Sequence, residues 1–318
     1  IGSCMVRTLN DAGKTDIIVV DNIASTDKWK NLSNKKYIKY VHKDKFLEDE
    51  LPLLSDVEAI IHLGACSSTT ERNFDYFYSN NFEYTKTLWK YCAENEIPFI
   101  YASSAATYGD GRMGFDDKAD INVLRPLNAY GYSKQLFDQW VERQIIQKTH
   151  TPPPQHVGLK FFNVYGPNEY YKGSMASMVF HGFKQIKEIG KITLFKSYKK
   201  PEYADGEQLR DFVYVKDVCQ VILWLLNNRH VSGLFNVGTC EARSFNDLAK
   251  ATFNALGLEP KIEYIDMPTD DLKAKYQYYT RATIQKLREA GYTHSFMSLE
   301  AGVKDYVTNY LDKDFSTF

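Results

Sequence analysis

The length and charge of the chain exclude several classes of protein. It has 318 residues, and 39 Lys and Arg against 40 Asp and Glu leave a formal net charge of −1 at pH 7. Because basic and acidic residues nearly cancel, the chain has no basic field that would recruit nucleic acid or an anionic membrane surface. No apolar run approaches the ~18 residues that span a bilayer. We therefore expect no nucleic-acid and no membrane partner, and enough chain for one or two packed domains.

The cysteines point to a reducing compartment. All five are scattered along the chain, without a Cys-x-x-Cys pair. This spacing predicts neither a zinc site nor a redox motif, and it suits the cytoplasm. We expect no metal, and we interpret Cys66 as a small buried apolar residue within a loop.

The N-terminal segment has the pattern of the second half of a dinucleotide-binding βαβ unit. Residues 5–12 predict a helix, and residues 16–22 predict a buried parallel strand. The first half would be an apolar strand and a glycine-rich turn that binds the pyrophosphate, and we expect about ten further residues before Ile1 to supply it. Gly2 would then be the last glycine of that turn and would permit close helix–strand packing.

The strand over residues 16–22 ends in a candidate ribose site. Asp21 follows Gly2 by about the 20 residues expected for the acid that accepts a hydrogen bond from the ribose 2′-hydroxyl of NAD. Asn22 follows it, and Lys28 lies in the next loop, where a cation could pair with the 2′-phosphate of NADP. These residues leave the choice between NAD and NADP open.

Strands and helices alternate through the first half, which predicts an α/β fold with a Rossmann-like, doubly wound parallel sheet. The predicted strands are residues 57–63, 98–103 and 157–164, the predicted helices are 80–95 and 129–147, and the small-residue loop 64–70 would let a backbone approach a dinucleotide.

After residue 166 the pattern becomes less regular. We expect an NADP-binding Rossmann domain over residues 1–166 and a smaller α/β substrate domain over 167–318. Residues 211–240 would return to the large domain, and an apolar tail helix over 299–311 would close the fold.

Three side chains predict a hydride-transfer site. Tyr130 and Lys134 are four residues apart and project from one face of the predicted helix. A tyrosine ionises near pH ~10, and a nearby ammonium or a nicotinamide cation favours the phenolate. Ser104 follows the strand over residues 98–103, at the sheet edge where open α/β folds bind ligands. Its hydroxyl could hold a substrate oxygen while Tyr130 moves the proton.

Several motifs, in family order and spanning nearly the whole chain, resemble the extended short-chain dehydrogenase/reductase family, whose members act on nucleotide sugars. They are residues 101–104, Tyr130 with Lys134, 162–167, 210–215 and 235–238. Residues 64–71, 103–109 and 172–177 resemble the branch of this family that epimerises an ADP-linked heptose at C6. That branch uses tightly held NADP and supplies a precursor of the lipopolysaccharide inner core. The resemblance also implies a homo-oligomer.

Carried onto this chain, the resemblance implies that Tyr130 and Lys172 are the acid/base pair, that Lys134 positions the cofactor and that Ser104 supports the substrate. The implied cofactor residues are Ile1, Gly2, Asp21, Asn22, Lys28, Lys43, Leu63, Gly64, Ala65, Cys66, Ser67, Asn80, Lys134, Val164 and Lys172. The implied substrate residues are Asn163, Ser174, His181, Phe195, Arg210 and Tyr276.

Some of these roles have a plainer alternative. An epimerase must return hydride to the opposite face of a ketone, and one fixed tyrosine cannot keep within about 3 Å of the oxygen in both steps. Lys172 could be the second group if burial lowered its pKa, or it could be a solvated loop lysine. Arg210 could clamp a diphosphate or pair with Asp211 or Glu207. His181 could contact substrate or belong to the core.

Other functions remain as alternatives. A 4,6-dehydratase would need an acidic pair after Ser104, where residues 105–107 are Ala-Ala-Thr, whereas a 4-epimerase needs none. A non-catalytic dinucleotide-binding protein would usually lack Tyr130 or Lys134. Residues 196–208 form an insertion relative to the family, which we interpret as a surface loop rather than as part of a nucleotide pocket.

Overall fold

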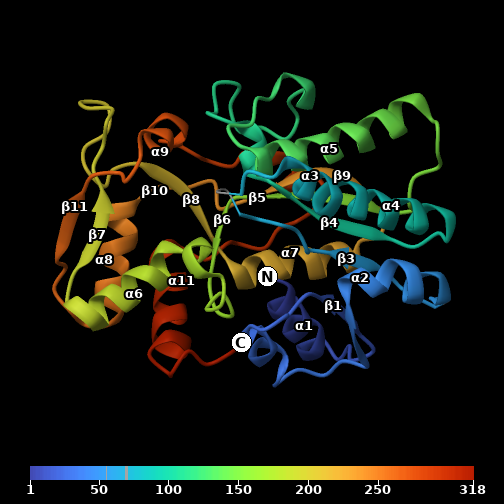
Figure 1. Ribbon diagram of the computed structural model, residues 1–318, viewed down its shortest axis with the longest axis horizontal. Coiled ribbons are helices and arrows are strands. Elements are labelled where there is room, and N and C mark those ends of the chain that lie inside the picture. The colour runs from blue at the N-terminus through green and yellow to red at the C-terminus, as the bar shows by residue number, and fades with distance from the viewer. Residues whose placement is uncertain (55, 69–70) are drawn as a thin grey trace.

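The computed structural model describes residues 1–54, 56–68 and 71–318, and it confirms an α/β fold of the doubly wound type (Figure 1). The strands are β1 (Ile18–Asp21), β2 (Lys39–His42), β3 (Ile60–His62), β4 (Phe99–Ser104), β5 (His156–Phe161), β6 (Asn163–Tyr165), β7 (Ile192–Phe195), β8 (Leu209–Tyr214), β9 (Gly233–Val237), β10 (Ala242–Ser244) and β11 (Ile262–Ile265). The helices are α1 (Gly2–Asp11), α2 (Lys43–Lys45), α3 (Phe74–Phe77), α4 (Tyr84–Glu94), α5 (Ala129–Gln147), α6 (Met178–Ile189), α7 (Val215–Asn227), α8 (Phe245–Ala255), α9 (Asp270–Lys275), α10 (Gln285–Glu289) and α11 (Leu299–Tyr306).

The main sheet is parallel, in the order β3-β4-β5-β9, and β1 pairs with β2 as a separate parallel pair. Successive side chains of β4 enter different apolar clusters. Phe99 and Tyr101 pack with Trp89 and Phe137 from α4 and α5, whereas Ile100 packs in the cluster that contains α7. A strand covered on both faces needs a nearly continuous apolar run, which explains the apolar pattern that predicted β4.

β1 and β3 border an open groove. Within the described residues, β1 pairs only with β2 and β3 only with β4. Their other edges line one cleft together with Leu9 of α1 and Leu226 of α7, and every residue of both strands is only half-buried. The groove lies where the sequence analysis expected a further strand. The close packing expected at Gly2 is wrong for this structure, since a Cβ there would meet nothing within 4 Å.

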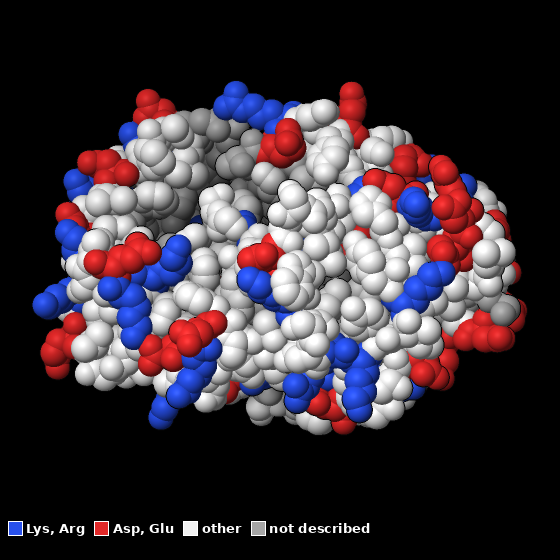
Figure 2. Space-filling model, turned by 60° about the horizontal axis from the view of Figure 1, so that its bottom comes forward, with Lys and Arg blue, Asp and Glu red and all other residues white. Residues whose placement is uncertain are grey.

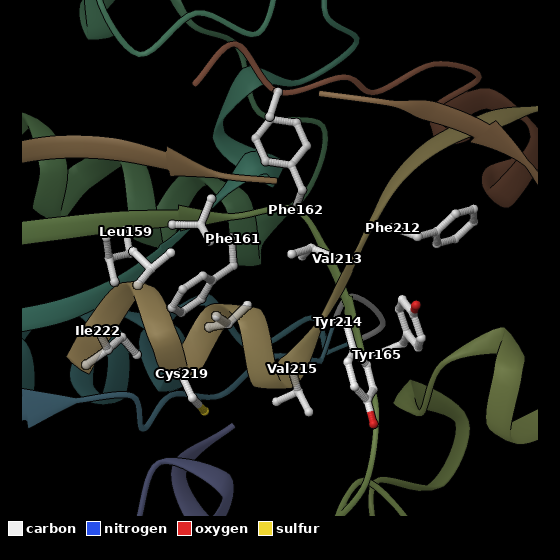
Figure 3. Close-up of a cluster of buried hydrophobic side chains, with 14 of the residues drawn as sticks. Leu159, Phe161, Phe162, Tyr165, Phe212, Val213, Tyr214, Val215, Cys219 and Ile222 are labelled. Atoms are coloured by element: carbon white, nitrogen blue, oxygen red, sulfur yellow. The ribbon is translucent and has the colours of Figure 1, made fainter. Parts of the chain in front are cut away.

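A smaller unit adjoins the main sheet. It contains a mixed sheet of order β10-β8-β6 and the parallel pair β11-β7, with α6, α8 and α11 beside them (Figure 1). One apolar cluster joins the two parts: Leu159 and Phe161 of β5 lie near Cys219 and Ile222 of α7, and the cluster continues to Val213 of β8 (Figure 3).

The strand predicted over residues 157–164 is wrong in one respect. It is two strands, β5 and β6, with Phe162 between them, because β6 leaves the main sheet to pair with β8. In the predicted returning segment, α7 contacts α1 and β9 pairs with β5, whereas β8 stays in the smaller sheet.

The helix predicted over residues 129–147 is confirmed as α5, and the tail helix is α11 followed by a wider turn over Val307–Leu311. None of the helices within the described ranges is long and apolar enough to cross a membrane. On the face drawn in Figure 2, basic and acidic side chains are interspersed, as the near-zero net charge suggests.

Candidate functional site

Ser104, Tyr130 and Lys134 line one cleft of about 1720 Å³ at the carboxyl end of the main sheet. Ser104 is the last residue of β4, and the two other side chains lie in the first two turns of α5. The Lys134 Nζ donates to the carbonyl of Ala102 at 2.8 Å, which ties α5 to β4. The structure thus brings together the three residues that the spacing predicted.

The start of α5 explains why Tyr130 reaches the end of β4. The side chain of Asn128 caps the helix by accepting a hydrogen bond from the Gly131 amide at 2.8 Å. A Cβ at position 131 would lie 2.7 Å from the carbonyl oxygen of Ala106. Glycine therefore permits the helix to approach the turn that follows Ser104, and this brings Tyr130 beside it.

Burial dominates the electrostatics of these side chains. It raises the pKa of Tyr130, although a hydrogen bond with Ser104 acts in the opposite direction. It also lowers the pKa of Lys134 to about 8, although the carboxylate of Asp138 opposes this. The expectation that Lys134 lowers the pKa of Tyr130 is therefore not met by the side chains alone, because desolvation outweighs the hydrogen bond with Ser104.

Asn81 fixes the loop that follows β3. Its amide donates to the carbonyl of Cys66 at 2.9 Å and to the Ser133 hydroxyl at 3.0 Å, and its Oδ1 accepts from the Cys66 amide at 2.8 Å. Cys66 is partly exposed, which corrects its interpretation as a buried residue. Residues 69–70 of the predicted loop lie outside the described residues. The sequence analysis chose the neighbouring Asn80 and missed Asn81, although both stand in the same Asn-Asn pair.

The candidate ribose site contains both an acid and cations. The Lys28 Nζ lies 2.9 Å from Oδ1 of Asp21 and donates to the carbonyl of Asn22 at 3.0 Å. The Lys43 Nζ donates to Oδ1 of Asn80 at 3.1 Å. The carboxylate of Asp21 is thus already paired with a cation, and a second cation lines the same cleft.

Lys172 lies in the loop between β6 and α6 and lines the same cleft as Tyr130. Its backbone amide donates to the carbonyl of Glu169 at 3.1 Å, and the Glu169 carboxylate accepts from the amide and hydroxyl of Ser177 at 2.8 and 2.6 Å. These bonds close the loop on itself and position Lys172. Its side chain is exposed, so the burial expected around it is not present.

Arg210 is a buried cation among aromatic rings. Only 6% of the residue is exposed, and its guanidinium lies 5.2 Å from the ring centre of Tyr276 and 5.6 Å from that of Phe245. It donates to the carbonyls of Leu209 and Gln277.

The interpretation of Arg210 as a structural ion pair is wrong. Among the side chains that the structure describes, which do not include that of Asp271, no carboxylate lies within 4.0 Å of its guanidinium. Asp211 accepts instead from Thr239, and Glu207 accepts from Asn246. Burial lowers the pKa of Arg210, as expected for a desolvated cation. Its carbonyl and ring partners carry no formal negative charge, and a buried cation is costly without one, so this position suits an anionic ligand.

The cleft includes every residue predicted for catalysis or cofactor binding and one predicted for the substrate, Asn163. Three other predicted substrate residues form a neighbouring cluster: Phe195 and Tyr276 have perpendicular rings 6.4 Å apart, and Arg210 lies over Tyr276. The cluster reaches the cleft through Phe245, which lines it.

The last two predicted substrate residues are not joined to this cluster. Ser174 is exposed in the short turn after Lys172, and His181 is half-buried on α6 with its ring 5.5 Å from that of Phe180. Gln277, which no sequence pattern marked, lines the cleft and donates to the carbonyl of Gly109. Within the described ranges, no group of three or more His, Cys, Asp or Glu side chains is arranged to hold a metal ion.

Comparisons with known proteins agree with this geometry. Residues 1–238 match the NAD dependent epimerase/dehydratase family. The ADP-L-glycero-D-manno-heptose-6-epimerase of Nitratidesulfovibrio vulgaris (strain DP4) is 52% identical over 314 residues, covering 98% of this chain and 95% of the relative. The enzyme of the same name from Fusobacterium nucleatum is 51% identical over 325 residues, covering 99% of this chain and 96% of the relative.

Solved structures give the same fold. The Helicobacter pylori ADP-L-glycero-D-manno-heptose-6-epimerase superposes with a TM-score of 0.77 at 28% identity, covering 97% of this chain and 92% of that one. A Thermus thermophilus UDP-glucose 4-epimerase in complex with NAD superposes with a TM-score of 0.76 at 21% identity, covering 96% and 94%, and so shows the fold alone. This chain belongs to the NAD-dependent epimerase/dehydratase family.

Proposed function

We propose that this protein is an ADP-heptose epimerase, which converts ADP-D-glycero-D-manno-heptose to ADP-L-glycero-D-manno-heptose for the lipopolysaccharide inner core. The main support is the identity of 52% and 51% with relatives of that name over nearly the whole chain. The same reaction is supported by the cleft, which is lined by Ser104, Tyr130, Lys134 and Lys172.

We propose NADP as the cofactor. Once bound, the dinucleotide accepts a hydride from the substrate carbon and returns it. The support lies in Lys28 and Lys43, which place two cations beside Asp21 and Asn80, where a 2′-phosphate would need positive charge. The pairing of Lys28 with Asp21 also weakens the repulsion that a free carboxylate would exert on that phosphate.

The residues of the cleft suit oxidation at a carbinol carbon followed by reduction from the other face. Ser104 holds the C6 oxygen, and Tyr130 takes the hydroxyl proton as the C6 hydride leaves, so that a ketone forms. After the ketone turns its other face to the hydride, Lys172 donates a proton to the oxygen as C6 is reduced. Lys134 keeps its ammonium close to Tyr130 and favours the phenolate. Each half-reaction moves one hydride and one proton. The cycle ends with Tyr130 protonated and Lys172 neutral, so exchange with water must return a proton from Tyr130 to Lys172 before the next turnover.

Arg210 would bind the diphosphate of the substrate. Its guanidinium is buried, and no carboxylate among the described side chains pairs with it, so a phosphate could supply the negative charge. The rings of Phe195 and Tyr276 beside it offer apolar faces to an adenine. We propose that Asn163, Ser174 and His181 complete the sugar site.

We also propose the domain division: residues 1–166 with the segment near 211–240 bind the dinucleotide, and the rest binds the sugar. The groove between β1 and β3 would take a further parallel strand followed by a glycine-rich turn, since two strand edges face it. We place the protein in the cytoplasm, as its five free cysteines suggest, and propose a homo-oligomer by analogy with the family.

The test is to incubate the protein with ADP-D-glycero-D-manno-heptose, with and without NADP⁺, and to follow the C6 epimer by NMR. The L-glycero product supports the proposal. Its absence, together with turnover of a UDP-hexose, would instead indicate a 4-epimerase and overturn the heptose assignment.

A further inference from the structure

A buried ion pair lies directly beneath the catalytic side chains. Asp138 of α5 and Lys160 of β5 approach to 3.2 Å between Oδ2 and Nζ, and their side chains are 0% and 1% exposed. Charges this deeply buried are costly unless they are paired and hydrogen-bonded. Asp138 follows Lys134 by one helical turn, so the pair adjoins the site without lining the cleft.

Hydrogen bonds connect this pair to the segment that carries Ser104. The Nζ of Lys160 donates to Oγ1 of Thr107 at 2.5 Å, and the Thr107 hydroxyl donates to the carbonyl of Ser104 at 2.8 Å. From the other side, the Ser103 hydroxyl donates to Oδ2 of Asp138 at 2.7 Å. A continuous chain of contacts therefore joins α5 to both sides of the peptide at Ser104.

Asp138 also acts on Lys134 through its charge. Desolvation lowers the pKa of Lys134, and the carboxylate opposes this by favouring the ammonium. Besides Ser103, two groups contact that carboxylate: Lys160, and the Tyr101 hydroxyl, which donates to Oδ1 at 3.3 Å. The same network thus positions Ser104 and places a negative charge close to Lys134.

We propose that Asp138 and Lys160 are positioning residues, which fix Ser104 relative to the Tyr130–Lys134 face of α5 and hold a carboxylate one helical turn from Lys134. The inference rests on the proposed role of Tyr130 and Lys134 in proton transfer, and it does not depend on the identity of the sugar.

Other titratable groups face this network from each element packed against it. Tyr101 approaches from β4, and the ring of Tyr108 lies 4.8 Å below the Lys160 Nζ. Asp117 and Lys286 act on Lys160 from the loop before α5 and from α10, with opposite effects on its pKa. His62 of β3 faces Lys134, and its pKa is lowered to about 3 by burial, so it stays neutral in the range tested.

The first test compares two neutralising substitutions in the active enzyme. Asp138→Asn removes the anion that supports the Lys134 ammonium, so the alkaline limb of the kcat–pH profile moves to lower pH. Lys160→Met frees the Asp138 carboxylate to act on Lys134 alone, so that limb moves to higher pH. We expect kcat to fall about 100-fold in both variants, since small misplacements of reacting groups cost this much, with KM nearly unchanged. Lys160→Arg, which keeps the charge and the donor, restores most of the loss.

The second test needs no turnover. Lysine side chains labelled with ¹³C at Cε report their titration by NMR in the protein without substrate, and Lys134→Arg identifies the resonance of Lys134. Its midpoint moves down in Asp138→Asn and up in Lys160→Met. If these shifts occur and another nucleotide sugar is turned over, but ADP-D-glycero-D-manno-heptose is not, the proposed function fails and the inference stands.

The matched control is Lys216→Met, which breaks the pair of Lys216 and Asp305 at 2.7 Å, far less buried at 27% and 22% side-chain exposure. It should lower thermal stability without changing kcat, KM or the pH profile. The inference is overturned if folded Asp138→Asn and Lys160→Met variants keep both kcat and the Lys134 titration. If neither variant folds, Asp138→Glu decides, because it keeps the charge but moves the carboxylate by one methylene: an unchanged kcat and an unchanged Lys134 titration midpoint in that variant also overturn the inference.

Discussion

Replacing Arg210 by methionine separates a ligand clamp from a structural residue. A clamp predicts weaker substrate binding with little change in stability, whereas a structural residue predicts a large loss of stability. Methionine keeps an apolar side chain among the rings of Tyr276 and Phe245 and removes the charge. Two hydrogen bonds from a guanidinium to a diphosphate contribute at least about 1.5 kcal/mol each. Their loss of about 3 kcal/mol corresponds to a rise in KM of roughly 150-fold. The kcat should change much less, because binding to a remote phosphate is similar in the ground and transition states.

The stability of Arg210→Met should remain close to that of the natural protein. The variant loses hydrogen bonds to the carbonyls of Leu209 and Gln277, a cost of about 1–3 kcal/mol, together with two cation–π contacts. It also removes a buried cation without a carboxylate partner, which returns several kcal/mol of desolvation. We expect the free energy of unfolding to change by less than about 2 kcal/mol, whereas breaking a buried ion pair costs about 3–5 kcal/mol.

The assay combines steady-state kinetics on ADP-heptose with urea unfolding of the protein alone. Arg243→Met is the matched control, because Arg243 is opposite Arg210 in the β8–β10 register and pairs with Asp247 and Glu300. It should leave KM unchanged. An unchanged KM for Arg210→Met, or a loss of 3–5 kcal/mol of stability, would refute our account of Arg210.

Three further predictions test the remaining groups. Tyr130→Phe should lower kcat about 1000-fold, because the proton can no longer be transferred. Lys172→Met should also abolish most turnover. Its midpoint of thermal unfolding should stay close to that of the natural protein, since Lys172 is exposed. Lys28→Met should raise the Kd of NADP about tenfold by calorimetry, with a smaller effect on NAD; equal effects would contradict a phosphate contact. Burial raises the pKa of Asp217 to about 6, so its folded form binds a proton more tightly than its unfolded form. The free energy of unfolding of the natural protein should therefore fall by up to about 3 kcal/mol as pH rises from about 4 to 6. That of Asp217→Asn should not fall in this way. Urea unfolding at several pH values checks this, and the same pH dependence in both proteins would count against it.

The sequence was most informative where chemistry depends on local spacing. Tyr130 and Lys134 are separated by one helical turn, and Ser104 directly ends an apolar strand, so all three could be placed from short patterns. The break at Phe162 could not, since an apolar run looks the same whether one strand or two pass through it.

Contacts between distant residues left no local signal. The bond from Arg210 to the carbonyl of Gln277 spans 67 residues, and nothing near Arg210 in the sequence shows that its carboxylate neighbours point elsewhere. Asp138 and Lys160 meet only because α5 packs on the main sheet. Nothing in the local sequence distinguishes these two residues from charged residues on the surface.

The groove between β1 and β3 has a consequence for how a strand would pair there. Within the described residues, each strand leaves one row of amide and carbonyl groups without a partner strand, and the two rows face a common space. A single extended segment entering there would satisfy both rows at once, so its docking should be all-or-none rather than gradual.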